Sequence, residues 1–275
     1  MPDASGPFAA PAPVGALRAA RMRDRLWPFP APVWGALGLA LLLGVWEAVP
    51  RLGLVPIMLL PPPSAIPAAF WRDFTSGEWQ RAIFASLGHY TMGLAIGSIG
   101  GIVAGVAAGA SARTDAALAY VVRILRPIPG LAWVPFAIIW FGVSTSAATF
   151  IVAVGVFWIN FFAALSAVQA VDRDLVEVAD AFGHGGFFGR LFKVILPAAS
   201  PAILGGLRTG LGQAWMAVVA AELFGVPGLG QRMMQASSLL AIELVVVYML
   251  TMAALYGAID WFFVKLRDRL LRWKA

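Results

Sequence analysis

The charged stretch from Asp172 to Pro201, DRDLVEVADAFGHGGFFGRLFKVILPAASP, separates two apolar runs of a mostly hydrophobic chain. Its first half has apolar residues at the i, i+3, i+4, i+7 spacing of one helical face, at Leu175, Val178, Ala179 and Phe182. Asp174 and Glu177 have the Asp-x-x-Glu spacing of a capping box, which marks the start of a helix. Together these features predict a short amphipathic helix that begins at Asp174.

The second half of the stretch predicts a hinge followed by another short helix. Gly183 is expected to end the first helix, and His184-Gly185-Gly186 to turn the chain. A second apolar face then follows, at Phe187, Phe188, Leu191 and Phe192. Pro197 is expected to open the next membrane helix. Two short helices and a hinge would form one docking surface for another molecule.

Composition places most of the chain in lipid. Of its 275 residues, 60% are hydrophobic and only 12% are charged, which is outside the range of soluble proteins. The chain has no cysteine and only two histidines, so disulfides, thiolate sites and multi-histidine metal sites are excluded. None of the three lysines, Lys193, Lys265 and Lys274, follows a glycine as a phosphate-binding loop requires. We therefore predict an integral membrane protein with no catalytic or metal site.

The residues of the docking stretch resemble those of the permease subunits of ATP-binding-cassette (ABC) importers. That family carries Glu-Ala-Ala, then Gly, then Ile-x-Leu-Pro, and the matching residues here are Glu177, Ala179, Gly183, Val194, Leu196 and Pro197. Val178 replaces the first alanine, and the interval from Gly183 to Leu196 is one residue longer than usual. The resemblance implies a coupling helix that sits in a groove of an ATPase subunit. The alternative is an amphipathic helix lying on the bilayer surface.

Six apolar segments predict six transmembrane helices, and the resemblance implies the type I ABC importer permease fold. The segments are residues 33–49, 83–108, 116–141, 148–170, 201–224 and 244–264. We expect residues 1–30, rich in Ala, Pro and Gly and then basic, to be a disordered cytoplasmic tail. Residues 31–275 would then be the transmembrane permease domain, with a cytoplasmic coupling loop at about 171–197.

The second apolar segment carries glycines at a strict four-residue step, at Gly93, Gly97, Gly101, Gly105 and Gly109. Such a stripe lets a neighbouring backbone approach closely, so we interpret it as a packing surface. His89 on the same helix is interpreted as a packing residue as well. An intramembrane enzyme using Ser98 with His89 is excluded, because nine residues on one helix separate the two side chains by roughly 13 Å.

The third apolar segment is interrupted by proline, at Pro127, Pro129 and Pro135. Breaks of this kind need protein or water around them. The segment also resembles a proline-rich stretch of the family that ends in Trp-Phe-Gly, here Trp140-Phe141-Gly142. Two interpretations stay open: a border of the translocation path, or a kinked packing helix.

The positions of the basic residues predict the orientation in the membrane. Of the twenty Lys and Arg residues, fifteen fall on the side of both termini and the docking stretch, and Arg208 lies within a span. The other side holds four: Arg51, Arg72, Arg81 and Arg232. The positive-inside rule therefore places both termini and the coupling loop in the cytoplasm. The resemblance implies a multi-pass protein of the bacterial inner membrane.

Three polar residues of the fifth span are candidates for the translocation path or gate: Arg208, Gln213 and Glu222. Charges inside a membrane usually face a bundle interior, a partner or water. Arg208, near the cytoplasmic end, is alternatively a residue that extends to the interface. Glu222 lies near the outer end and is expected to brace an outer gate around Pro227-Gly228. The two are about 21 Å apart along the helix and cannot pair.

The resemblance is closest to the branch that imports nitrate, taurine and aliphatic sulfonates. It implies two permease subunits, usually identical, two ATPase subunits that bind ATP and Mg²⁺, and a periplasmic or extracellular substrate-binding protein. No cofactor and no nucleic acid is expected on this chain. Two other functions stay open: an ABC permease for a pyrimidine vitamin precursor or another small solute, and a secondary transporter that needs no ATPase.

Overall fold

The computed structural model describes residues 31–184 and 186–271, and all regular elements of this described part are helices. The chain divides into two compact units, Met1–Ser64 and Ala65–Ala275. The tail predicted for residues 1–30 lies outside the described residues and stays a prediction.

The first unit contains one apolar helix, α2 (Ala31–Arg51), and the connector that follows it. The Glu47 carboxylate near the end of α2 accepts hydrogen bonds from the backbone N–H of Ser64 at 3.1 Å and from its hydroxyl at 2.7 Å. Trp46 donates its indole N–H to the carbonyl of Pro61 at 3.0 Å. These contacts fold the proline-rich connector back onto the end of α2.

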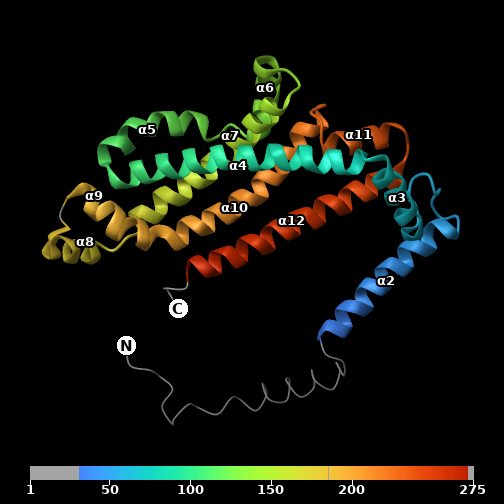
Figure 1. The fold of residues 1–275 in the computed structure, drawn as a ribbon, viewed down its shortest axis with the longest axis horizontal. Coiled ribbons are helices and arrows are strands. Elements are labelled where there is room, and N and C mark those ends of the chain that lie inside the picture. The colour runs from blue at the N-terminus through green and yellow to red at the C-terminus, as the bar shows by residue number, and fades with distance from the viewer. Residues whose placement is uncertain (1–30, 185, 272–275) are drawn as a thin grey trace, which may run out of the picture. The chain divides into compact units, whose positions relative to one another are not determined.

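The second unit contains four long apolar helices and one bent pair (Figure 1). The long helices are α4 (Glu78–Ala110), α7 (Thr145–Gln169), α10 (Leu196–Leu223) and α12 (Ile242–Leu270). The bent pair consists of α5 (Ala112–Leu125) with η2 (Gly130–Trp133) and α6 (Val134–Phe141), at 81° to one another. With α2 these elements give the six predicted spans, and the break in the third falls at Pro127 and Pro129, where the ring removes a backbone donor.

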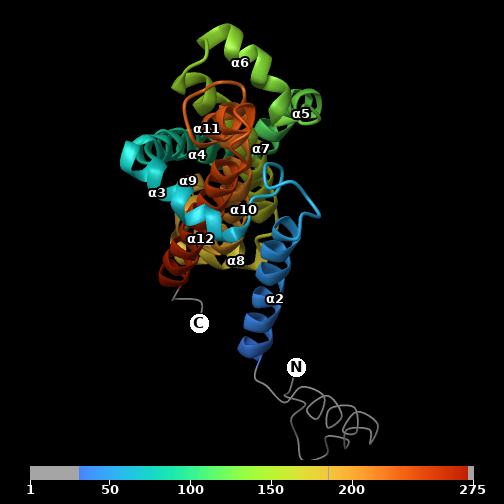
Figure 2. The same cartoon turned by 90° about the vertical axis from the view of Figure 1, so that its right-hand side faces the viewer.

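Shorter helices join the spans of the second unit. At one end of α10 lie α8 (Arg173–Ala179), η3 (Asp180–His184), α9 (Phe187–Arg190) and η4 (Leu191–Ile195). At its other end lies α11 (Leu229–Ser238), and α3 (Ile66–Ser76) precedes α4 after the short η1 (Pro63–Ala65). Figures 1 and 2 show α10 running beside α7 and α12. Thus α10 connects two groups of short helices at opposite ends of the bundle.

The glycine stripe of α4 packs directly on the backbone of α7, as predicted. A methyl group added at Gly97, Gly101 or Gly105 would lie 2.3 to 2.4 Å from a carbonyl oxygen of α7. Gly93 and Gly109 meet Val152 and Val168 of the same helix at 2.5 and 2.8 Å. Among the described helices these two form the most extensive contact, because the small residues let their backbones approach.

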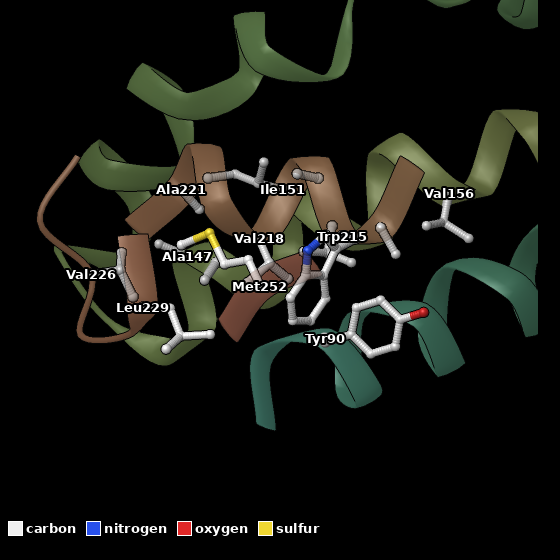
Figure 3. Close-up of a cluster of buried hydrophobic side chains, with 14 of the residues drawn as sticks. Tyr90, Ala147, Ile151, Val156, Trp215, Val218, Ala221, Val226, Leu229 and Met252 are labelled. Atoms are coloured by element: carbon white, nitrogen blue, oxygen red, sulfur yellow. The ribbon is translucent and has the colours of Figure 1, made fainter. Parts of the chain in front are cut away.

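The core of the bundle lies where α4, α7, α10, α11 and α12 meet (Figure 3). Tyr90 and Trp215 pack edge to face, with ring centroids 5.5 Å apart. Asn160 of α7 is fully buried and donates to the Ser98 hydroxyl of α4 at 3.1 Å. Ser98 therefore serves packing between α4 and α7, and its partner is Asn160 rather than His89.

The short helix after α10 begins earlier than its apolar residues suggested. The sequence after the Pro227–Gly230 turn predicts a short apolar helix around Met233 to Leu240, whereas α11 runs from Leu229 to Ser238. The early start has a physical reason: the N–H groups of Leu229 and Gly230 find acceptors on Ser86 and Glu222, so the first turn can form without a capping side chain of its own.

Candidate functional site

The predicted docking surface lies between α7 and α10 and consists of α8, η3, α9 and η4, which we call the coupling region. Its first helix, α8, begins at Arg173, one residue before the predicted start at Asp174. The N-cap is Asp172, whose carboxylate accepts from the N–H of Asp174 at 3.0 Å. The capping box of Asp174 and Glu177 was therefore wrong: Asp172 has the extended backbone that a cap requires, and Glu177 lies exposed within α8.

Gly183 provides the hinge of the coupling region. Its φ is +80° and its ψ is 13°, a left-handed conformation that disfavours other residues. No other group lies within 4 Å of the position where its side chain would start. Across the hinge, Arg190 of α9 donates to Asp180 at 2.6 Å. Among the described residues, the left-handed backbone of Gly183 turns the chain, and the Arg190–Asp180 ion pair joins the two sides of the hinge.

The apolar face predicted for α8 divides into a buried residue and exposed ones. Ala179 is buried, whereas Leu175, Val178 and Phe182 are exposed. The second short helix adds more exposed apolar side chains, at Phe187, Phe188 and Phe192. Leu196 and the exposed Pro197 begin α10 directly afterwards. The coupling region thus presents apolar side chains that the described chain leaves uncovered, next to the start of α10.

Glu222, at the far end of α10, has no exposed surface. Its carboxylate accepts from the Ser86 hydroxyl at 2.6 Å and from the N–H of Gly230 at 2.8 Å. Nδ1 of the buried His89 lies 3.4 Å from the same carboxylate. A methyl group on Gly228 would lie only 2.1 Å from a Glu222 oxygen, so the carboxylate lies directly against the Pro227-Gly228 turn, where bracing was predicted.

Arg208 forms a bidentate ion pair with Asp260 of α12. Its Nε and a terminal nitrogen donate to the two carboxylate oxygens, both at 2.8 Å. The two side chains keep 44% and 28% of their surface exposed, although both helices are apolar enough to span a membrane. Arg208 and Glu222 do not pair, as predicted. Gln213 is half-buried on the same helix and lies across from Gly155 of α7.

Residues 97–272 match the family described as binding-protein-dependent transport system inner membrane component. The chain belongs to this family. The family's description names inner membrane components of transport systems that depend on a binding protein, which agrees with the several apolar spans of this chain. The chain is accordingly a multi-pass permease of the inner membrane.

Individual permeases and a solved structure agree with this assignment. The chain is 34% identical to the aliphatic sulfonates transport permease protein SsuC of Escherichia coli (strain K12), over 84% of this chain and 88% of the relative. It is 31% identical to the taurine transport system permease protein TauC of the same strain, over 94% and 95%. A structure of the MetNI methionine ABC transporter in inward-facing conformations shares the fold, with a TM-score of 0.58, 22% identity, and coverage of 70% of this chain and 94% of that chain.

Two polar residues of the permease were missed by the sequence reasoning. Asp260 carried a usable signal, because it is an acidic residue inside an apolar span. Ser86 carried no such signal, because its role depends on the meeting of three helices, α4, α10 and α11. Its hydroxyl on α4 contacts Glu222 of α10 and Leu229 of α11.

A third polar group of the permease holds the middle of α11. Arg232 contacts Asp73 of α3 at 3.2 Å, the Tyr248 hydroxyl of α12 at 3.2 Å and Glu78 of α4 at 3.8 Å. The Tyr248 hydroxyl also donates to Asp73. The sequence analysis counted Arg232 only among four basic residues on the outer side. The structure shows that its side chain contacts three other helices, α3, α4 and α12.

Proposed function

We propose that this chain is the transmembrane subunit of an ABC importer for a small anion, and that the coupling region docks onto the ATPase. The observation that carries the proposal is the coupling region itself: exposed apolar side chains on both sides of the Gly183 hinge, directly before α10. Exposed apolar patches of this kind on a protein surface indicate a partner. In this proposal Glu177, Ala179, Gly183, Leu196 and Pro197 shape the docking surface, and ATP and Mg²⁺ bind to the partner ATPase.

The solute class is supported by the relatives. Permeases named for aliphatic sulfonates, taurine and bicarbonate are 31 to 34% identical to this chain. These solutes share a compact anionic group, and nitrate has the same character. A pyrimidine vitamin precursor or another small solute is the second candidate. A screen of the cognate binding protein against taurine, alkanesulfonates, nitrate and bicarbonate would identify the solute.

The orientation follows the basic residues. The side of the coupling region carries most of the Lys and Arg residues, and the positive-inside rule assigns that side to the cytoplasm. The opposite side, with α3 and α11, would then face the substrate-binding protein.

A second copy of this chain completes the proposed assembly. In the first half of α10, from Leu196 to Thr209, Ala199 alone is buried, whereas eleven residues of α7 are buried. Arg208 of α10 pairs with Asp260 of α12, and both side chains keep exposed surface. Charged groups in a membrane require water or protein around them. We infer that α10 faces the partner permease and the translocation path, to which Arg208 and Gln213 contribute. The intact mass of the purified complex would count the copies.

The test of the coupling proposal uses two glycines of the same region. Gly183→Val places a β-branched side chain at φ +80°, which costs about 1–2 kcal/mol or more and distorts the hinge. Gly186→Val is the matched control, because Gly186 has φ −73° and equally open surroundings. We expect Gly183→Val to reduce ATPase co-purification and solute uptake at a normal membrane level of the permease, and Gly186→Val to have much smaller effects.

Two results would contradict the coupling proposal. Equal ATPase binding and uptake in both variants would show that the hinge does not shape a docking surface. If the native chain purified without any ATPase and still transported solute, it would instead be a secondary transporter.

A further inference from the structure

The first turn of α11 lacks a capping side chain of its own. The residue before it is Gly228, which has no side chain to offer. Instead, the N–H of Leu229 donates to the Ser86 hydroxyl of α4 at 2.9 Å, and the N–H of Gly230 donates to the Glu222 carboxylate of α10 at 2.8 Å. The Ser86 hydroxyl donates in turn to Glu222 at 2.6 Å. Two other helices thus supply the cap, which we call the Ser86–Glu222 cap.

The cap is buried and sterically exclusive. Ser86, Glu222 and Gly230 are all buried, so water does not compete for these hydrogen bonds. A methyl group on Gly230 would lie 2.8 Å from the carbonyl oxygen of Val219 and 2.9 Å from Cβ of Glu222. Because an unpaired buried donor or carboxylate is costly, the start of α11 stays in place only while α4 and α10 keep their present separation.

One continuous helix links this cap to the coupling region. α10 begins at Leu196, directly after η4, and ends at Leu223, one residue after Glu222. Its 28 residues correspond to a rod of about 40 Å. Along the way it packs tightly on α7, where Gly206 and Gly210 meet Ala163 and Asn160. A displacement of its cytoplasmic end would therefore move Glu222 relative to Ser86.

We propose that Ser86 and Glu222 are positioning residues for transport, which hold the start of α11 in the present state and release it when α10 moves. The inference rests on the proposed docking of the ATPase at the coupling region. The separation of α10 from α4 would withdraw Glu222 from Gly230 and from Ser86 together. Arg232 would keep the middle of α11 attached to α3 and α12, so α11 would pivot rather than detach.

The experiment uses the complete complex of permease, ATPase and binding protein in lipid nanodiscs and proteoliposomes. The variants are Ser86→Ala and the isosteric Glu222→Gln, with Ser86→Thr as the rescue because threonine keeps the hydroxyl. Ser98→Ala is the matched control, since it removes another buried serine of α4 that contacts Asn160 rather than α11. The readouts are solute imported per ATP hydrolysed, and hydrogen exchange of the amides of residues 228–231.

We expect complexes with Ser86→Ala or Glu222→Gln to assemble and to hydrolyse ATP. The amount of solute imported per ATP should fall at least about fivefold. Ser86→Thr and Ser98→Ala should match the wild type. In the wild type, residues 228–231 should exchange faster in the ATP-trapped state than without nucleotide, and in Ser86→Ala they should exchange fast in both.

Three outcomes would overturn the inference. The first is an unchanged ratio of solute to ATP in both cap variants, and the second is equal protection of residues 228–231 in both states of the wild type. The third is failure of both variants to assemble, which would make the cap a condition of folding. A wild-type complex without bound ATPase would instead refute the proposed function, and the two failures are distinguishable.

Discussion

The ion pair with Asp260 changes what Arg208 can do in the membrane, because it neutralises the charge of the guanidinium group. Both of its donors that face Asp260 are already occupied, at 2.8 Å each, so the pair is neutral and the guanidinium is not free. An anion would have to share Arg208 with Asp260 or displace it. The pair therefore supplies a polar, oriented group on the exposed side of α10 rather than an isolated positive charge.

The role of Arg208 can be separated from the role of the pair. Arg208→Gln removes the ion-pair partner of Asp260 within an apolar span, and we expect uptake to fall roughly tenfold or more. Asp260→Asn should reduce uptake in the same way. If Arg208 contacts the solute, the double variant Arg208→Gln with Asp260→Asn stays at the level of Arg208→Gln. Recovery of uptake in the double variant would show that the pair is structural.

The sequence predicted which single residues are important where the residue type itself was unusual for its position, but it did not predict their partners. Glu222 and Arg208 attracted notice because charges are rare in apolar helices, and the bracing of the Pro227-Gly228 turn by Glu222 has its counterpart in the structure. Their partners Asp260 and Ser86 could not be assigned, because pairing between helices depends on their relative register. That register is fixed by tertiary packing, which no periodicity in a single helix encodes.

At the scale of helices, the contact between α4 and α7 tolerates no added atoms. Gly101 would place a methyl group 2.4 Å from the carbonyl oxygen of Phe157, whereas Gly100, next to it, would place one 3.5 Å from the Phe157 ring. The two positions differ only in which way they face, so they form a matched pair.

We expect Gly101→Ala to destabilise the permease by about 1–3 kcal/mol, the usual cost of overpacking. Gly100→Ala should be neutral or slightly stabilising, because alanine favours a helix more than glycine does. Thermal unfolding in detergent, followed by tryptophan fluorescence, measures both. Equal midpoints for the two variants would contradict the close approach of α4 to α7.

Elements were predicted better than their ends. All six spans, the proline break of the third and the packing function of the glycine stripe were confirmed. The starts of α8 and α11 were wrong, for a shared reason: a helix begins where its first N–H groups find acceptors. For α8 the acceptor is Asp172, two residues before Asp174, and for α11 the acceptors belong to other helices.

At the scale of the whole molecule, the proposed orientation is open to a direct test, because the chain has no native cysteine. Cysteines at the exposed positions Ser76 and Ser237 should react with an impermeant thiol reagent in intact cells. A cysteine at the exposed position Asp174 should react only after permeabilisation. Labelling of position 174 in intact cells would reverse the orientation, and with it the side on which an ATPase could dock.

The close fit between α4 and α7 also bears on the order in which the chain is made. α4 leaves the ribosome first, the bent pair of α5 and α6 follows, and only then does α7 arrive. Until α7 is made, the glycine stripe of α4 lacks the helix against which it packs in the folded chain. Once α7 is inserted, the nascent chain contains both helices of the most extensive described contact. The remaining spans can then pack on this pair. α10, with Gly206 and Gly210 packed against α7, is the next long helix to be made. The pair of α4 and α7 can therefore form before α10 is synthesised and packs on it.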